Sequence, residues 1–290
     1  MIHTNTIFAL SSGHGTAGVA VIRLSGPGAL KALSLLTGGK ALAARHAVVR
    51  ALLDPETSER LDRALVIMFP GPASFTGEDV AELHLHGGRA VVEGVLSALG
   101  NMDGLRPAEA GEFSRRAFEN GKLDLTEAEG LNDLIHAQTA AQRGQALRQM
   151  DGELRTLYDG WRSRLLSHLA HLEADIDFPD EDLPDGVSGT VKPNILNIEL
   201  EVSQHIDEGR RGRMMRDGFR IVILGEPNTG KSTLLNAIAR ADVAIVSEEA
   251  GTTRDVIEIQ LDLGGFPVRL IDTAGVRDSE GIVVKLVVLG

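Results

Sequence analysis

The residues best equipped for chemistry form one glycine-rich run, Gly225-Glu226-Pro227-Asn228-Thr229-Gly230-Lys231-Ser232. Its pattern, G-x-x-x-x-G-K-S, lets backbone N–H groups surround a phosphate chain, and the N-terminus of a following helix adds positive partial charge. Lys231 would reach the terminal phosphates, and the Ser232 hydroxyl would ligate Mg²⁺. The pattern needs a strand before it and a helix after it, and the sequence predicts both, a buried parallel strand at 219–224 and a helix at 233–241. The alternative is a glycine-rich turn that binds no ligand.

Two further elements follow this phosphate loop in the order typical of a GTPase. Thr252 and Thr253 lie in a polar segment, where a hydroxyl would reach Mg²⁺ only while a γ-phosphate is bound. Asp272 ends a predicted strand, where it would hold a metal-bound water, and the amide of Gly275 would bond the γ-phosphate. Phosphoryl transfer asks the protein mainly for positioning and charge neutralisation, and these groups supply both.

Length and composition narrow the class of protein. The 290 residues allow two or more domains, and 43% hydrophobic with 24% charged residues is typical of a globular protein. The chain has no cysteine, which excludes disulfides and thiolate metal sites. The sequence contains neither a signal peptide nor a membrane-spanning run, so we expect a cytoplasmic protein without a membrane partner. A net charge of −12 argues against a broad nucleic-acid-binding surface, although a local basic patch remains possible.

The first 122 residues predict a mixed α/β domain. Strands are expected at 6–10, 19–24, 47–53, 64–69 and 80–86, and helices at 29–36 and from Gly88 to Leu99. Along 80–86 the apolar residues Ala81, Leu83 and Leu85 would face the core, and the polar residues Glu82, His84 and His86 would share the other face. That polar face has three interpretations: a pocket for an organic ligand, a metal site, or a solvated strand.

Long helices follow. Thr126 and Glu129 have the spacing of a capping box. Apolar residues then recur at helical spacing, which we interpret as core packing: Leu147, Met150, Leu154, Leu157, Trp161, Leu165, Leu169, Leu172 and Ile176. Residues 175–185 are acidic, and their two prolines interrupt this stripe. We interpret the segment as a solvated connection, and the alternative interpretation is a metal site.

A second helix carries apolar residues at 195, 198, 202 and 206 and is expected to end near Gly218. Four arginines lie in its last turns, where they either favour the helix dipole or contact RNA: Arg210, Arg211, Arg213 and Arg216. Beyond the phosphate loop, strands 256–263 and 266–271 are predicted to pair through a hairpin turn at Gly264-Gly265.

The sequence resembles one family, MnmE (also called TrmE), the tRNA-modifying GTPases. The matching stretches are TIFALSSGHGTAGVAVIRLSGP, FTGEDVAELHLHGG, PAEAGEFSRRAFENGKLDL, LEADIDFPDED, GEPNTGKSTLLN, GTTRD and DTAG. They run through nearly all of residues 4–278 in the family's order. The N-terminal stretches are more specific than the GTPase ones, which many phosphate-loop proteins share.

This resemblance implies an α/β multidomain protein with three parts. They are an N-terminal folate-binding and dimerisation domain at 1–122, the first half of a helical domain at 123–217, and an incomplete GTPase (P-loop) domain at 218–290. The family acts as a homodimer with the flavoprotein MnmG (GidA) in a heterotetramer, and the complex reaches the tRNA. It adds a carboxymethylaminomethyl or aminomethyl group to C5 of the wobble uridine (U34), and a 5-formyl- or 5,10-methylene-tetrahydrofolate supplies the one-carbon unit.

The resemblance also implies site residues. Arg23, Glu82 and Lys122 match folate contacts, and Ser232 and Thr253 match Mg²⁺ ligands. The potassium ion, which acts as an arginine finger does, would be held around Asn228, Ser247, Glu249 and Thr252. The implied GTP contacts are Asn228, Thr229, Gly230, Lys231, Ser232, Thr233, Ser247, Glu248, Glu249, Ala250, Gly251, Thr252, Thr253, Asp272, Thr273, Ala274 and Gly275.

The C-terminal tail departs from the family. Val284 stands where the family has its catalytic glutamate, and residues 281–290 do not resemble the family. The guanine-selecting motif, the second helical half and a C-terminal cysteine motif are absent, so we expect a truncated or frameshifted chain. With three strands and one helix, its partial sheet would present an unpaired edge, and GTPase activity would be weak or absent. Two rival functions are a folate-binding dimerisation remnant and another phosphate-loop GTPase, such as a ribosome-assembly factor.

Overall fold

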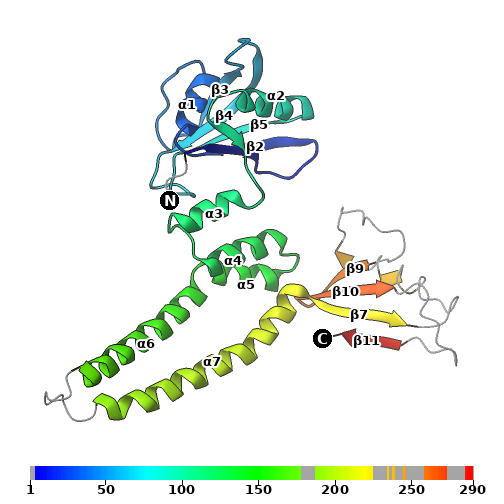
Figure 1. The fold of residues 1–290 in the computed structure, drawn as a ribbon. Helices are drawn as coiled ribbons and strands as arrows, with labels where there is room; N and C mark the ends of the chain where they lie inside the picture. Colours follow the sequence, from blue (N-terminus) through cyan, green and yellow to red (C-terminus); the bar gives the residue numbers. More distant parts are fainter. Residues whose placement is uncertain are drawn as a thin grey trace. The chain divides into compact units, whose positions relative to one another are not determined.

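The computed structural model describes residues 4–177, 187–224, 234, 237–238, 244–245, 258–272 and 285–289. The chain divides into two compact units, Met1–Leu125 and Thr126–Gly290. Figure 1 shows the elements of each unit, and we treat the two units separately. The division predicted at 122 and 217 remains a prediction.

The first unit is built on a six-stranded sheet. Its strands are β1 (Thr6–Leu10), β2 (Ala17–Ser25), β3 (Val48–Leu53), β4 (Arg60–Phe69), β5 (Val80–Gly87) and β6 (Leu105–Pro107), in the order β3-β4-β5-β2-β1-β6. Neighbouring strands are antiparallel, except that β6 runs parallel to β1. The alternation predicted for β5 is confirmed: its apolar residues are buried, Glu82 and His84 are half-buried, and His86 is exposed.

Helices cover the two faces of this sheet differently. The helices α1 (Ala29–Leu36) and α2 (Arg89–Gly100) pack on one face, where they join the β-strand side chains in a single apolar core. The helix α3 (Glu112–Glu119) lies on the other side of the sheet (Figure 1). The sequence predicted α1 and α2 but not α3 or β6. β6 has only three residues, and α3 buries charged residues, so neither element shows an apolar stripe.

The second unit begins with two short helices. Helix α4 spans Leu125–His136, so Thr126 lies in its first turn, and the capping box at that residue stays a prediction. A capping box does occur at α5 (Ala140–Met150), where Thr139 Oγ1 accepts from the Gln142 N–H at 3.2 Å and Gln142 Oε1 accepts from the Thr139 N–H at 3.0 Å.

Two long helices, α6 (Glu153–Asp177) and α7 (Val187–Asp217), follow α5. The predicted stripe is interrupted at Gly152, whose φ of +83° ends the helical path between α5 and α6. The core-packing interpretation is also wrong for the distal half of α6, because its apolar side chains are 38–75% exposed: Leu165, Leu166, Leu169, Leu172 and Ile176. Helix α7 ends before Gly218, as predicted, with Arg216 in its last turn.

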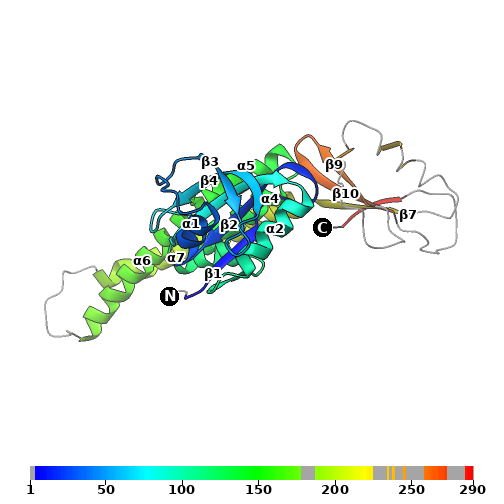
Figure 2. The same cartoon turned by 90° about the horizontal axis from the view of Figure 1, so that it is seen from above.

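A second sheet completes the unit. Its strands are β7 (Phe219–Leu224), β8 (Ala244–Ile245), β9 (Glu258–Leu263), β10 (Phe266–Asp272) and β11 (Lys285–Leu289), and the strand order is β11-β7-β10-β9-β8. Figure 2 shows β7, β9 and β10 together. The expectation of a three-stranded sheet is therefore wrong, since residues 285–289 pair antiparallel with β7 and residues 244–245 pair with β9. The predicted parallel strand 219–224 and the hairpin at 264–265 are confirmed.

Candidate functional site

The first candidate site lies at one edge of the second sheet. β7 and β10 are parallel, with Asp272 opposite Ile223, so the carboxyl ends of both strands meet at the same edge. The phosphate-loop sequence starts one residue after β7 ends. Ligands of parallel sheets bind beyond the carboxyl ends of the strands. The fold therefore brings the end of β7, which directly precedes the loop sequence, and Asp272 to the same end of the sheet.

Most residues predicted for the nucleotide site fall outside the described part of the chain. Only Asp272 is described, as the last residue of β10. The acidic residues 178–186 also lie outside the described part of the chain. The other residues predicted for the nucleotide site that lie outside it are Asn228, Thr229, Gly230, Lys231, Ser232, Thr233, Ser247, Glu248, Glu249, Ala250, Gly251, Thr252, Thr253, Thr273, Ala274, Gly275 and Val284.

The second candidate site lies on the first sheet. Arg23 on β2 stands opposite Glu82 on β5, and two donors of its guanidinium, Nε and Nη2, bond one oxygen of Glu82 at 3.0 and 2.8 Å. The other Glu82 oxygen lies 3.3 Å from Nε2 of His84. The Arg23 and Glu82 side chains are 28% and 16% exposed, so this ion pair is partly shielded from water yet open on one side. Neighbouring antiparallel strands thus unite two of the three residues predicted to contact folate.

Two aromatic rings flank the guanidinium of Arg23. Its Cζ lies 5.3 Å from the ring centroid of Phe75 and 5.9 Å from that of Phe113, within the range of cation–π attraction. The sequence analysis missed both rings. They belong to the stretches FTGED and EFSRRAF, and neither shows a periodicity that would point its ring toward β2.

Lys122 reaches the same region through a different contact. A Cβ on Gly77 would lie 3.2 Å from Cε of Lys122, so the backbone two residues after Phe75 passes directly beside the lysine stem. Lys122 itself is exposed. Two of the three predicted folate residues therefore lie beside one loop, Arg23 next to Phe75 and Lys122 next to Gly77.

The polar face of β5 does not form a metal site. His86 bonds Asp62 through Nδ1 at 2.8 Å and through its backbone N–H at 2.9 Å, whereas Glu82 and His84 bond each other. Within the described ranges, no group of three His, Cys, Asp or Glu side chains could hold a metal ion. The metal interpretation of Glu82, His84 and His86 is wrong because their bonds lead to different partners.

An open cleft of about 830 Å³ adjoins Phe113. Its walls come from β1, the end of α2 and the segment between β6 and α3, with Leu10, His14, Leu96 and Glu109 among them. Phe113 lines this cleft and also lies beside Arg23, whereas Arg23 and Glu82 are not among the residues that line it.

The helices of the second unit form a cleft of about 550 Å³. Acidic and basic side chains both line this cleft, including Glu129, Asp133, Arg213 and Arg216. Arg216 donates to the adjacent Asp217 at 3.2 Å, and this bond raises the pKa of its guanidinium against the opposing effect of desolvation. The choice between helix capping and RNA contact for this arginine group stays a prediction. None of the helices in the described residues is both long and apolar enough to span a membrane.

Comparison with known proteins gives matches over most of the chain. A protein-family model described as GTP-binding protein TrmE N-terminus matches residues 6–122, and one described as MnmE helical domain matches residues 125–281.

Curated relatives are similar over 95–96% of this chain. The tRNA modification GTPase MnmE of Parvibaculum lavamentivorans is 59% identical over 278 residues, and that of Rhodospirillum rubrum is 56% identical over 291 residues. The human protein named 5-taurinomethyluridine-[tRNA] synthase subunit GTPB3, mitochondrial, is 58% identical over 278 residues. The chain spans 64% of the length of the two bacterial relatives and 56% of the human one.

Proposed function

This chain belongs to the MnmE (TrmE) family, and on that premise we propose that it serves GTP-dependent modification of the wobble uridine of tRNA. In this proposal the second unit binds GTP and the first unit binds a tetrahydrofolate that supplies the one-carbon unit. The product is a carboxymethylaminomethyl group on C5 of uridine 34, made together with a flavoprotein of the MnmG type.

The observation that carries the GTP part is the parallel pairing of β7 with β10. It supports a nucleotide site because the loop G-x-x-x-x-G-K-S and Asp272 then start from adjacent strand ends. Lys231 would neutralise phosphate charge, while Ser232 and Thr253 would ligate Mg²⁺. A bound Mg²⁺ supplies charge neutralisation to the transferred phosphoryl group. Asn228, Ser247, Glu249 and Thr252 would hold K⁺.

The folate part is supported by the Arg23–Glu82 pair and its aromatic neighbours. A carboxylate has about four acceptor sites, so Glu82 retains acceptors for the N–H donors of a pterin edge after bonding Arg23. Phe75 and Phe113 offer flat apolar surface beside it, and the Lys122 ammonium would suit the glutamate tail of the folate. The donor and acceptor types present therefore fit a pterin.

The proposal also covers the binding partners and the cellular location of the protein. By family membership the chain acts as a homodimer, contacts tRNA within the complex with the flavoprotein, and works in the cytoplasm. These statements depend on the family and not on a contact within the described residues.

Calorimetry on the purified chain with GTP and with 5-formyl-tetrahydrofolate, in Mg²⁺ and K⁺, tests both parts. We expect Lys231→Ala to abolish GTP binding and to leave folate binding unchanged, with the exposed Lys192→Ala as the matched control. Glu82→Gln should weaken folate binding by at least about tenfold, while Glu93→Gln, on an exposed residue, should not.

The outcomes separate the proposal from its rivals. Folate binding without GTP binding supports the dimerisation remnant, and GTP binding without folate binding supports another phosphate-loop GTPase. Potassium-stimulated GTP turnover, followed by phosphate release, measures how far the chain hydrolyses GTP with Val284 at its present position. Turnover at the rate of its relatives would contradict the expected weak activity.

A further inference from the structure

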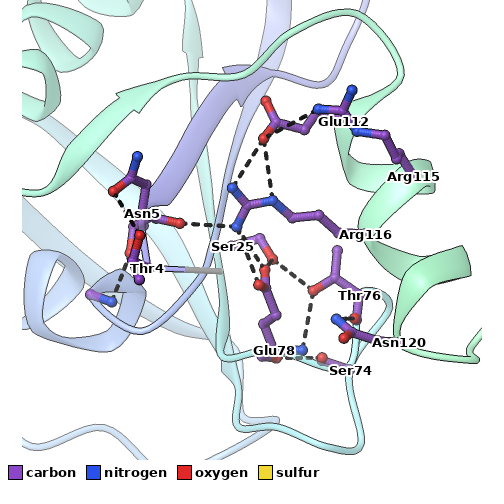
Figure 3. A network of polar contacts seen from close by, with 12 residues as sticks. Thr4, Asn5, Ser25, Ser74, Thr76, Glu78, Glu112, Arg115, Arg116 and Asn120 are labelled. Atoms are coloured by element: carbon purple, nitrogen blue, oxygen red, sulfur yellow. Dashed lines mark hydrogen bonds and ion pairs between the residues drawn. The ribbon is translucent and has the colours of Figure 1, made fainter. Parts of the chain in front are cut away.

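Two stretches of the first unit, 75–79 (FTGED) and 112–118 (EFSRRAF), have no role in the sites described above apart from their phenylalanines. The structure joins them. The loop at residues 74–78, between β4 and β5, is bonded to α3 through a buried set of charged and hydroxyl side chains (Figure 3).

Arg116 lies at the centre of this set and is 1% exposed. Its Nη1 donates to the two carboxylate oxygens of Glu78 at 3.2 and 3.1 Å and to the backbone carbonyl of Asn5 at 3.0 Å. Its Nε and Nη2 donate to Glu112 at 3.3 and 3.0 Å. One guanidinium therefore connects α3, the start of β1 and the 74–78 loop.

Hydroxyl groups extend the contact to β2. The Ser25 hydroxyl donates to Glu78 at 2.6 Å and lies 2.6 Å from the Thr76 hydroxyl, which also accepts from the Glu78 N–H at 3.3 Å. Ser25 and Thr76 are fully buried. Because buried polar groups are costly unless bonded, these contacts fix the loop backbone in one position.

Arg106 completes the charge balance on the far side of Glu112. It bonds both Glu112 oxygens, at 2.6 and 2.8 Å, and this bond is the largest cause of the lowered pKa of that carboxyl, about 2. Arg106 and Arg116 thus both bond the buried Glu112, and Arg116 also bonds the partly buried Glu78. Arg106 is 38% exposed and bonds Pro107 and Glu112 rather than the 74–78 loop, which makes it a useful control.

The same loop carries the contacts to the predicted folate residues. Phe75 lies over Arg23, and Gly77 passes beside Lys122. Asn120 Nδ2 donates to the Thr76 carbonyl at 2.8 Å, which ties the segment leading to Lys122 to the loop as well. Gly77 has a φ of +78°, so the tight path between Thr76 and Glu78 favours glycine.

We propose that Arg116 and Glu78 are positioning residues for the folate site. Their ion pair holds the 74–78 loop against α3, so that Phe75 stays over Arg23 and Gly77 stays beside Lys122. Both residues would act on the site through the loop, and the inference rests on the proposed folate function. It predicts that a change at Glu78 alters the site through the loop.

The test compares Glu78→Gln with Arg106→Leu in the full chain. Both changes break one charged bond of the set, but only the first touches the loop. Hydrogen exchange of residues 70–80 is measured by mass spectrometry without ligand. Relative to the wild type, it should be about tenfold or more faster in Glu78→Gln and unchanged in Arg106→Leu, even if both variants lose the same amount of melting temperature. The Kd for 5-formyl-tetrahydrofolate should rise about tenfold in the first variant only.

A conservative series at Arg116 separates positioning from bulk stability. Arg116→Lys keeps the positive charge but loses the planar guanidinium with its several N–H donors. Its loop exchange rate and its affinity for the folate should therefore lie between those of the wild type and of Arg116→Gln. Equal loop exchange in Glu78→Gln and Arg106→Leu overturns the inference, whatever the affinity. If the wild-type chain fails to bind the folate, the proposed function fails, and the exchange measurement still decides whether the ion pair holds the loop.

Discussion

On β5 of the first unit, Ala81, Leu83 and Leu85 are at most 1% exposed, whereas on α6 of the second unit Leu165 and Leu169 are 45% and 51% exposed. Both elements carry a regular apolar pattern, and in both we predicted a core-facing side from that pattern. In β5 the prediction is confirmed, and in the distal half of α6 it is wrong.

The difference lies in what covers each element. The apolar face of β5 meets α1 and α2, which bring their own apolar faces. Helix α6 meets α7 in part through polar and aromatic side chains, including the bond of Trp161 and the ion pair of Arg164 with Glu201, and its distal leucines stay exposed. A periodic pattern therefore tells which side of an element is apolar, but the fold decides whether that side is buried.

The largest expected contrast comes from shortening one leucine in each region. Leu83→Ala should cost about 2–5 kcal/mol of unfolding free energy because it opens a cavity in a closed core. Leu169→Ala should change the free energy by no more than about 0.5 kcal/mol, since its side chain is half in water.

Urea unfolding measures this contrast by two signals. Circular dichroism reports both units, and fluorescence of Trp161, the chain's one tryptophan, reports the second unit alone. We expect Leu83→Ala to move a transition seen by dichroism without moving the fluorescence transition. Equal losses in the two variants would mean that α6 is buried in solution as deeply as β5.

The second prediction concerns the pH dependence of the first unit. The pKa of Glu112 falls from 4.5 to about 2, chiefly through its bonds with Arg106. A lowered folded-state pKa stabilises the fold above pH 4.5, and this stabilisation is lost as the pH falls toward 2. One such group contributes a slope of at most about 1.4 kcal/mol per pH unit.

Glu112→Gln should flatten that slope between pH 4.5 and 2 in urea titrations followed by dichroism. Glu109→Gln, on a carboxylate that is 67% exposed, is the control and should leave the slope in place. A slope that persists in Glu112→Gln would place the titrating group elsewhere.

The third prediction asks where the second unit is closely packed. Gly130 on α4 faces α5, and a Cβ there would lie 2.8 Å from the Met150 nitrogen and 3.1 Å from the Ala146 carbonyl. Gly130→Ala should therefore cost about 1–3 kcal/mol. Gly144→Ala, in the middle of α5 with its nearest neighbour at 3.7 Å, should instead gain about 0.5–1 kcal/mol.

Melting followed by Trp161 fluorescence distinguishes the two substitutions, because both lie in the unit that contains the tryptophan. Opposite signs are expected. If both variants melt alike, α4 and α5 do not approach each other as closely as the fold indicates.

The smallest effect is expected at the α6–α7 contact. Glu201 accepts from Trp161 Nε1 at 2.9 Å and pairs with Arg164, and both charged side chains are 43% exposed. Glu201→Gln should lower the melting temperature only slightly, and 1 M salt should remove the difference because exposed ion pairs are screened. A changed emission maximum of Trp161 would still report the lost bond, and a large salt-resistant loss would contradict the exposed geometry.

Much of the fold follows from local patterns. The predicted segments 6–10, 29–36 and 219–224 have the bounds of β1, α1 and β7, and the hairpin at Gly264-Gly265 connects β9 and β10 as expected. Local signals failed for α3, whose buried residues include the charged Glu112 and Arg116, and for β11, which pairs with the distant strand β7. Alternation placed Glu82 on a polar face, but it did not identify Arg23 as its partner, since strand register joins residues 59 positions apart.

The sequence by itself singled out the residues that we predict to carry chemistry, the phosphate-loop run and Asp272, and it holds the stretches that identify the family. It also determined the local elements, because helix and strand periods depend on neighbours a few residues apart. Only the tertiary structure decided that Arg23 pairs with Glu82 between Phe75 and Phe113, and that Arg116 joins α3 to the 74–78 loop. Those contacts bring together segments from distant parts of the chain, and only sheet register and helix docking determine which of them meet.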